Sequence, residues 1–189
     1  ELPAELVAGT PLAQALELPD ASFELKLTPN RPDCLGLEGL ASEVATLFDV
    51  PRRSPDASPV AAVTNDTRKV SLAAPERCPR FCGRVVTGID PRARTPLWMA
   101  ERLRRSGLRP ISAIVDCTNY VMLELGQPLH AFDNAKLAGA IHVRLPQPGE
   151  QVLLLNGQTI TPIGLTKAAH IYFRAMTVYQ GPASGFAAP

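Results

Sequence analysis

The sequence predicts an α+β fold in which a small structural domain precedes a larger domain that mixes helices and strands. Alternating apolar and polar residues, the period of a strand, occur at residues 23–28 and 141–145. Apolar residues recur every three or four positions, the period of a helix, within residues 37–47 and 97–106. Residues 51–69 contain prolines and show no period, which indicates a linker between the two domains.

The composition is that of an ordinary globular protein. Hydrophobic residues make up 46% of the 189 residues, and the formal net charge is +1, which predicts no global attraction to nucleic acid or membranes. No apolar run approaches the ~20 residues of a membrane helix, and the N-terminal residues show no signal-peptide pattern. We therefore expect a soluble, cytoplasmic protein that contacts no membrane.

The four cysteines also fit a reducing compartment. Cys78 and Cys82 have a spacing that resembles half of a zinc site, but a tetrahedral site needs three or four ligands and no second pair follows. We interpret them as structural cysteines and expect no metal.

The first 50 residues are expected to form surface turns, one strand and one packing helix. Prolines and a glycine interrupt residues 1–20, which excludes a long helix there. The alternation at residues 23–28 predicts a strand with one buried face. Asp33 could cap the next helix, and with Asn30 and Arg31 it is interpreted as local turn chemistry rather than catalysis. The apolar stripe of that helix consists of Leu37, Leu40, Val44 and Leu47.

The second domain is expected to begin with strands at residues 70–73 and 81–87, the second of them buried on both faces. A helix over residues 97–106 follows, with Thr95 as its N-cap and Pro96 at its first position, where the missing amide costs nothing. This helix should bury Trp98, Met99 and Leu103 and end at Gly107.

The same helix carries the basic residues Arg102, Arg104 and Arg105, which with Arg92, Arg94 and Arg109 form the one basic concentration in the sequence. Two interpretations are about equally favoured. The cations could form a solvated face that matches the helix dipole, or they could contact the phosphates of an RNA. The cluster lacks interleaved aromatic residues that could stack on bases.

Residues 109–133 are the best candidate for a binding site. Asp116 is expected to cap a helix that ends at Gly126. Arg109 before this helix and His130 after it could converge on one crevice, where the guanidinium could bind a carbonyl, phosphate or carboxylate and the imidazole could exchange protons. Thr118 and Asn119, expected near the helix start, would add neutral polar groups. Alternatively, His130 could satisfy backbone groups, and Arg109 could pair with Asp116 or Glu124.

The C-terminal part is expected to contain a short turn after Asp133, a strand at residues 141–145 and then a hairpin. The hairpin would join residues 151–155 to 158–161 through Asn156-Gly157, a pair that readily adopts a type I′ turn. Residues 161–189 show no sustained pattern and contain no Asp or Glu, and only a possible strand at residues 171–173 is expected there.

Three motifs, in this order, resemble the beta subunit of bacterial phenylalanine–tRNA ligase: FELKLTPNRPDCLGLEGLASEVATLFDVP, CPRFCGRVVTGID and GLRPISAIVDCTNYVMLELGQPLHAFD. The resemblance covers residues 1–160. It implies a structural domain segment at residues 1–50, a linker at 51–69, the N-terminal portion of a B3/B4-type editing module at 70–160, and an unmatched tail at 161–189. The Gly-rich segment with an acidic residue that should complete the module is absent, so we expect the editing-module-like domain to be incomplete.

The resemblance implies a part in the phenylalanyl-tRNA aminoacylation complex and in hydrolysis of tyrosine wrongly esterified to the phenylalanine tRNA. Arg109, Asn119 and His130 fall on positions associated with the editing pocket of that family. ATP and magnesium would concern only the assembled enzyme, because its synthetic site lies in the alpha subunit, and this chain is expected to hold no cofactor. The expected partners are the alpha subunit and the phenylalanine tRNA.

Two other hypotheses remain open. The chain could be a non-catalytic module that binds tRNA or a protein, which the missing acidic residue favours. It could also be a truncated, non-functional fragment with an altered reading frame, which the sudden loss of pattern after residue 160 favours.

Overall fold

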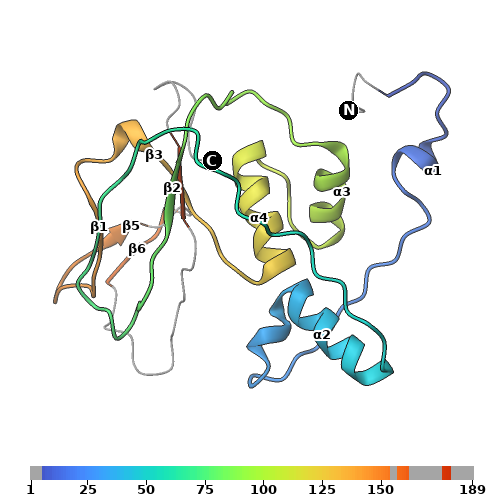
Figure 1. Ribbon diagram of the computed structural model, residues 1–189, viewed down its shortest axis with the longest axis horizontal. Coiled ribbons are helices and arrows are strands. Elements are labelled where there is room, and N and C mark those ends of the chain that lie inside the picture. Colours follow the sequence, from blue (N-terminus) through green and yellow to red (C-terminus); the bar gives the residue numbers. More distant parts are fainter. Residues whose placement is uncertain (1–5, 154–156, 162–175, 180–189) are drawn as a thin grey trace. The chain divides into compact units, whose positions relative to one another are not determined.

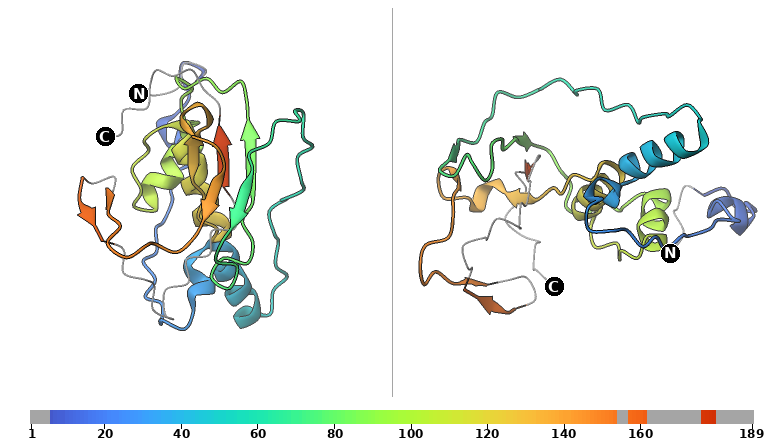
Figure 2. Two further views of the ribbon diagram at one scale, coloured as in Figure 1. Left: turned by 90° about the vertical axis from the view of Figure 1, so that its left-hand side faces the viewer. Right: turned by 90° about the horizontal axis from the view of Figure 1, so that it is seen from below.

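A computed structural model describes residues 6–153, 157–161 and 176–179. The chain forms two compact units, each built from two segments. The helical unit consists of residues 1–61 and 90–129, and the sheet unit consists of residues 62–89 and 130–189. All α-helices of the described residues lie in the first unit and all strands in the second (Figures 1 and 2). This mixture of helices and small sheets agrees with the predicted α+β class.

The helical unit is organised around α4, against which both α2 and α3 pack (Figure 1). Leu103 of α3 is fully buried, and Trp98 of α3 meets Tyr120 of α4 edge to face with 5.3 Å between ring centroids. The elements are α1 (Leu12–Ala15), the 3₁₀ turn η1 (Pro32–Leu35), α2 (Leu37–Phe48), α3 (Leu97–Arg105) and α4 (Ala113–Leu125).

Glycines allow the closest contacts within this unit. Gly126 ends α4 in a left-handed conformation with φ of 65°, as predicted. Gly36 precedes α2 and lies so close to this end that a Cβ there would be 2.5 Å from the amide nitrogen of Gly126. Gly39, one turn into α2, packs on η1 in the same way, and an added Cβ would overlap the carbonyl oxygen of Asp33. Both approaches require a residue without a side chain.

The predicted N-caps are wrong. The cap of α4 is Ser112, which accepts a hydrogen bond from the amide of Val115, and not Asp116. Thr118 and Asn119 therefore lie in the middle of the helix. The position before α3 is Pro96, without a side-chain cap, because the hydroxyl of Thr95 donates to Asp116 instead. Tertiary partners have displaced the local capping bonds.

The helix before the linker also begins later than expected. Its N-cap is Gly36, and Asp33 lies inside η1. The short helix α1 was not predicted. The strand predicted at residues 23–28 does not form, because no strand of the described chain pairs with it. Its expected buried face is exposed, with Phe23 at 84%.

The sheet unit contains three small sheets. A parallel pair joins β1 (Val70–Leu72) to β4 (Ile141–Val143). A second, parallel sheet has the order β2, β7, β3, with bounds Gly83–Val86, Met176–Tyr179 and Ala131–Asp133. An antiparallel hairpin pairs β5 (Val152–Leu153) with β6 (Thr159–Ile160), and the turn η2 (Asn134–Lys136) follows β3.

Most predicted strands of this unit are confirmed, although they are shorter than expected. The hairpin forms, and Ile141 and Val143 of β4 alternate with the exposed His142 as predicted. Burial of β2 on both faces is wrong, since Gly83 and Arg84 are exposed. The strands β3 and β7 were not predicted, and β7 lies within the supposedly patternless tail. The possible strand at residues 171–173 lies outside the described residues.

Each compact unit combines two separate segments of the chain, whereas each predicted domain is one continuous segment. The domain boundaries expected from the sequence, 1–50, 51–69, 70–160 and 161–189, therefore stay a prediction.

Candidate functional site

Asp116, in the first turn of α4, organises the chain around the candidate site. Its side chain has no exposed surface, and one carboxylate oxygen accepts a hydrogen bond from the amide of Ile111 at 2.8 Å. The other accepts from the hydroxyl of Thr95. One carboxylate thus fixes the segments before α3 and before α4. This arrangement anchors the backbone two residues after Arg109.

Arg109 is exposed, and within the described residues no hydrogen bond or ion pair holds its guanidinium. The proposed pairing with Asp116 or Glu124 is therefore not found. Pro110 follows it and Ile111 is tied to Asp116, so the backbone beside the guanidinium is restrained while the charge stays available. Such a group can meet an anionic or carbonyl ligand without first losing an internal partner.

Thr118 and Asn119 are neighbours in the middle of α4 and are both partly buried. The hydroxyl of Thr118 donates to the carbonyl of Val115 at 2.7 Å, which leaves it only acceptor capacity for a ligand. Adjacent helix positions project about 100° apart, so the two side chains do not share one face. Within the part of the chain that the structure describes, the side chain of Asn119 makes no hydrogen bond, so its amide donor and its carbonyl acceptor are both available there.

His130 lies in the sheet unit, immediately before β3. Its imidazole is exposed and packs edge to face on Phe132, with ring centroids 4.5 Å apart. Arg109, Thr118 and Asn119 belong to the helical unit. Convergence of the four residues on one crevice stays a prediction.

The three arginines of α3 all have intramolecular partners. Arg102 lies 5.3 Å from the ring of Trp98 and donates to the hydroxyl of Tyr120 at 2.9 Å, a bond that raises the pKa of the guanidinium. The remaining pairs are Arg104 with Glu101 at 2.8 Å, and Arg105 with Asp20 at 2.5 Å and with Glu101 at 3.5 Å.

The three arginines differ in how accessible their charges are to a ligand. The side chain of Arg105 is only 15% exposed and also donates to the carbonyl of Leu16, so it ties the N-terminal segment to α3. Arg104 is 63% exposed and pairs within one helix turn, a weak interaction that an anionic ligand could replace. The geometry thus gives Arg105 a structural role, while Arg102 and Arg104 still present their charge to solvent.

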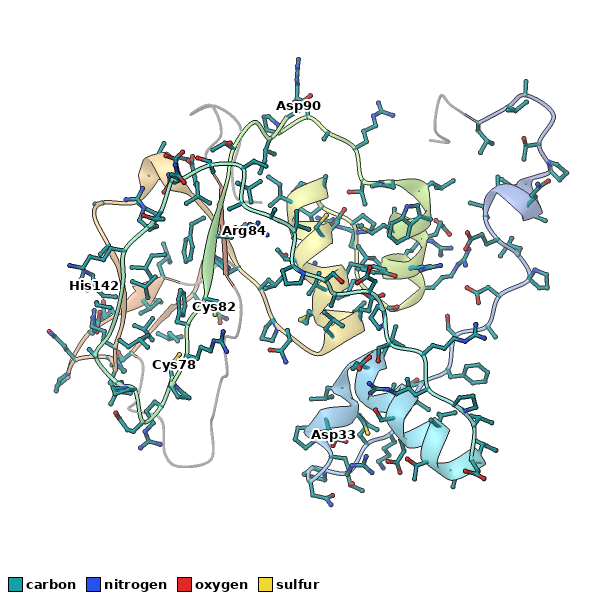
Figure 3. The ribbon with its side chains drawn as sticks, in the orientation of Figure 1. Asp33, Cys78, Cys82, Arg84, Asp90 and His142 are labelled. Atoms are coloured by element: carbon teal, nitrogen blue, oxygen red, sulfur yellow. The ribbon has the colours of Figure 1, made fainter. Side chains whose placement is uncertain are left out.

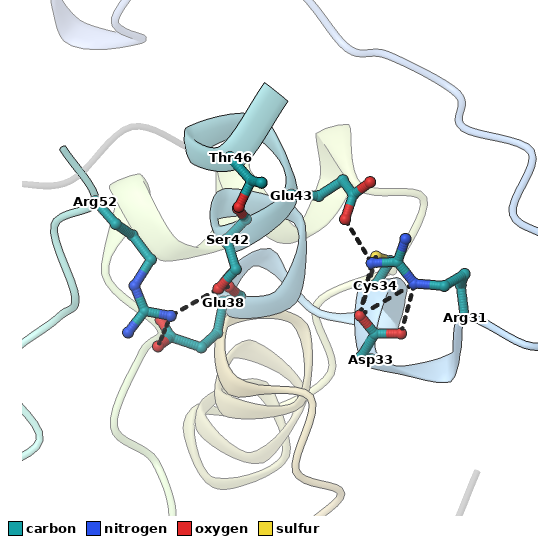
Figure 4. A network of polar contacts seen from close by, with 8 residues as sticks. All are labelled: Arg31, Asp33, Cys34, Glu38, Ser42, Glu43, Thr46 and Arg52. Atoms are coloured by element: carbon teal, nitrogen blue, oxygen red, sulfur yellow. Dashed lines mark hydrogen bonds and ion pairs between the residues drawn. The ribbon is translucent and has the colours of Figure 1, made fainter. Parts of the chain in front are cut away.

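A second polar network lies at the start of α2 (Figure 4). Arg31 bridges Asp33 at 2.8 Å and Glu43 at 2.6 Å, and the same nitrogen is 3.2 Å from the sulfur of the buried Cys34. The hydrogen bond from Arg31 lowers the pKa of Asp33 to about 2. The network fastens η1 to α2 and gives Arg31 and Asp33 structural partners, while the interpretation that they have no catalytic role stays a prediction.

The lowered pKa gives a test of this network. The ordinary pKa of Asp33 is 3.8 and the folded value is about 2, so its stabilisation is present above pH 3.8 and is lost as the pH falls through about 2. We expect Asp33→Asn to destabilise the chain at pH 5 and to flatten the loss of stability between pH 5 and pH 2. Urea unfolding at a series of pH values measures both effects. The exposed Glu24→Gln is the control, and an unchanged slope in Asp33→Asn would contradict the assignment.

Sequence reasoning missed several polar pairs in the sheet unit, among them Arg68 with Asn134, Arg144 with Glu150, and Ser71 with His142. Ser71 of β1 and His142 of β4 are register partners, and the serine oxygen is 2.6 Å from Nδ1 of the imidazole. No acidic group of the described residues completes a triad with them. Figure 3 shows His142, Cys78 and Cys82, and all four cysteines of the chain are free thiols. The described residues contain no cluster of three metal-ligating side chains.

The comparisons with known proteins show what this chain is similar to. The family model of the B3/4 domain matches residues 77–168. The chain is also 58% identical over 162 residues to the phenylalanine–tRNA ligase beta subunit of Aromatoleum aromaticum, which covers 86% of this chain and 20% of that protein. The beta subunits of Dechloromonas aromatica and Methylococcus capsulatus are 56% and 55% identical over 84% and 85% of this chain, again with 20% of each relative covered.

These matches confirm the resemblance to the phenylalanine–tRNA ligase beta subunit. The chain spans about a fifth of the length of the curated relatives it matches. None of the helices in the described residues has the length and apolar character needed to span a membrane.

Proposed function

We propose that this chain acts as a segment of a cytoplasmic phenylalanine–tRNA ligase beta subunit and contributes to hydrolytic editing of tyrosine on the phenylalanine tRNA. The observation that carries the proposal is 58% identity to such a subunit over 86% of this chain, together with the B3/4 match. The alpha subunit and the phenylalanine tRNA are the proposed partners. ATP and magnesium would act at the synthetic site of the assembled enzyme rather than on this chain.

The chemistry of the candidate residues suits ester hydrolysis. Water must attack the ester carbonyl, and donors must stabilise the oxyanion that develops. The unpaired guanidinium of Arg109 and the amide of Asn119 can donate to that oxygen or to the nearby phosphate, while Thr118 can accept a hydrogen bond. The exposed imidazole of His130 can orient the water. Selection of tyrosine would need a polar group that pairs with the phenolic hydroxyl.

The arginines of α3 fit a second part of this role. Arg102 and Arg104 could neutralise tRNA phosphates, because both guanidinium groups are exposed and each has a partner within the helical unit that a phosphate could replace. Arg105, predicted with them as an RNA contact, is the least suited, since its ion pair with Asp20 would have to break.

Deacylation of tyrosyl-tRNA tests the proposal. We expect the purified chain to release tyrosine from tyrosyl-tRNA(Phe) above the uncatalysed rate, and Arg109→Ala with His130→Ala to reduce this release by about 100-fold or to background. A double variant of equal composition change, Arg53→Ala with His142→Ala, is the control. Equal release by both double variants, or equal release from phenylalanyl-tRNA, would contradict the proposal.

A non-catalytic binding module is the second candidate, since residues 161–189 contain no Asp or Glu to accept the phenolic hydroxyl. It predicts that the chain binds the phenylalanine tRNA without releasing tyrosine. It also predicts that Arg104→Ala weakens this binding, as measured by filter retention at several salt concentrations. A truncated, non-functional fragment would show neither binding nor release.

A further inference from the structure

Residues 23–28 have the alternating sequence of a β-strand, but no strand of the described residues pairs with them. Phe23 and Leu25 alternate with the charged Glu24 and Lys26, so an extended backbone places apolar side chains on one face and charges on the other. No backbone hydrogen bond of the described residues holds residues 23–27. Phe23 and Leu25 are 84% and 56% exposed. The segment is therefore an unpaired stretch of chain in which two of the three alternating apolar side chains are exposed.

The helix α2, which follows in the same unit, also leaves apolar side chains uncovered. The polar side of α2 is occupied, because Glu38 and Ser42 bind Arg52 at 2.9 and 2.7 Å (Figure 4). The apolar side is exposed, with Leu47 at 75%. The stripe predicted to pack a core is therefore largely uncovered, since Leu37, Val44 and Leu47 are exposed, and the neighbouring Phe48 is exposed as well.

An unpaired segment with the sequence of a strand and an exposed apolar side of a helix are both unusual in a folded protein, because both promote aggregation. A strand with one charged and one apolar face normally lies in a sheet whose apolar face is covered by a helix. The two uncovered features of the helical unit are the parts of such a layered arrangement. Residues 23–28 lack a neighbouring strand, and the apolar side of α2 lacks apolar side chains that would cover it.

We propose that residues 23–28 become a β-strand by pairing with an extended, alternating apolar segment from the rest of the beta subunit, and that this region also covers the apolar side of α2. The relatives provide the source of such a segment, since about four fifths of their length lies outside the part that this chain matches. A segment of the same polypeptide is present at high effective concentration and can pair without a separate association step. The inference rests on the proposed role as part of a beta subunit.

Hydrogen exchange tests this pairing in a full-length subunit. The aligned part of the Aromatoleum aromaticum beta subunit is replaced by this chain, and the amides of residues 23–28 are compared in the replaced subunit and in the isolated chain. We expect the amides directed at the partner strand to exchange at least about 100-fold more slowly in the full-length subunit. Equal, fast exchange in both proteins would overturn the proposal.

Substitutions assign the protection to the apolar face. Leu25→Asp in the full-length subunit should return the amides of residues 23–28 to fast exchange, whereas Glu24→Lys, on the opposite face, should keep them slow. Protection in the isolated chain together with a dimer by light scattering would instead identify a second copy as the partner and overturn the proposal. Deacylation of tyrosyl-tRNA measured on the same subunit distinguishes the strand pairing from the proposed editing function. Editing can fail while the amides of residues 23–28 are protected, and editing can succeed while they exchange fast.

Discussion

Asp116→Ala should lower the free energy of unfolding by about 2–4 kcal/mol, because it removes a fully buried carboxylate and leaves the amide of Ile111 and the hydroxyl of Thr95, both in part-buried hydrogen bonds, without their acceptor. The change also releases the backbone beside Arg109, so we expect slower deacylation of tyrosyl-tRNA. Urea unfolding followed by circular dichroism measures the loss of stability.

Two variants show whether the loss comes from the buried bonds. Asp116→Asn keeps one good acceptor and should cost roughly half as much. Asp90→Ala removes an aspartate whose pair with Arg92 is exposed and should change stability by no more than about 0.5 kcal/mol. A loss no larger in Asp116→Ala than in Asp90→Ala would show that the carboxylate does not hold the two segments.

Gly39→Ala should destabilise the chain by about 1–3 kcal/mol, although alanine is the better helix former. At an exposed helix position this substitution normally stabilises by about 0.5–1 kcal/mol. Here the new Cβ overlaps the carbonyl oxygen of Asp33, a backbone atom that moves only if η1 shifts away from α2. The sign of the change therefore reports the packing directly.

Thr46→Ala, at an exposed position of the same helix, is the matched control and should stay within about 0.5 kcal/mol of the wild type. Both variants are compared by thermal and urea unfolding. Stabilisation by Gly39→Ala would mean that η1 does not pack on α2 as described.

The ends of helices were predictable because their signals are local. Gly107 and Gly126 follow α3 and α4 with φ of 83° and 65°, and both were expected from the sequence. The N-caps were not predictable in this way. Thr95 and Asp116 are good local caps, but they bind each other across 21 positions of the chain, and no local pattern encodes that contact.

Strands depend even more on distant partners. Residues 23–28 have a clear alternation and form no strand here, because alternation specifies a face and not a neighbour. Conversely, β7 has little pattern of its own yet lies between β2 and β3. Pairing between segments 46 and 93 positions apart is set by the fold as a whole.

The candidate site comes mainly from motifs and stays a prediction. Arg109 was expected either to bind a ligand or to pair with Asp116 or Glu124, and its guanidinium has no partner in the described residues. The partners of the other basic residues were not foreseen. Asp20 lies 85 positions from Arg105, and their ion pair links two segments of the chain, while the RNA contact expected of Arg105 stays a prediction.

The most direct test of the proposed function is editing by the assembled enzyme. A phenylalanine–tRNA ligase whose beta subunit carries this chain in place of the aligned part of the Aromatoleum aromaticum subunit is assayed for hydrolysis of tyrosyl-tRNA(Phe). We predict hydrolysis within about tenfold of the unaltered enzyme, and a loss of about 100-fold with Arg109→Ala and His130→Ala while aminoacylation continues. Normal aminoacylation without hydrolysis, or hydrolysis unaffected by the two substitutions, would contradict the proposed function.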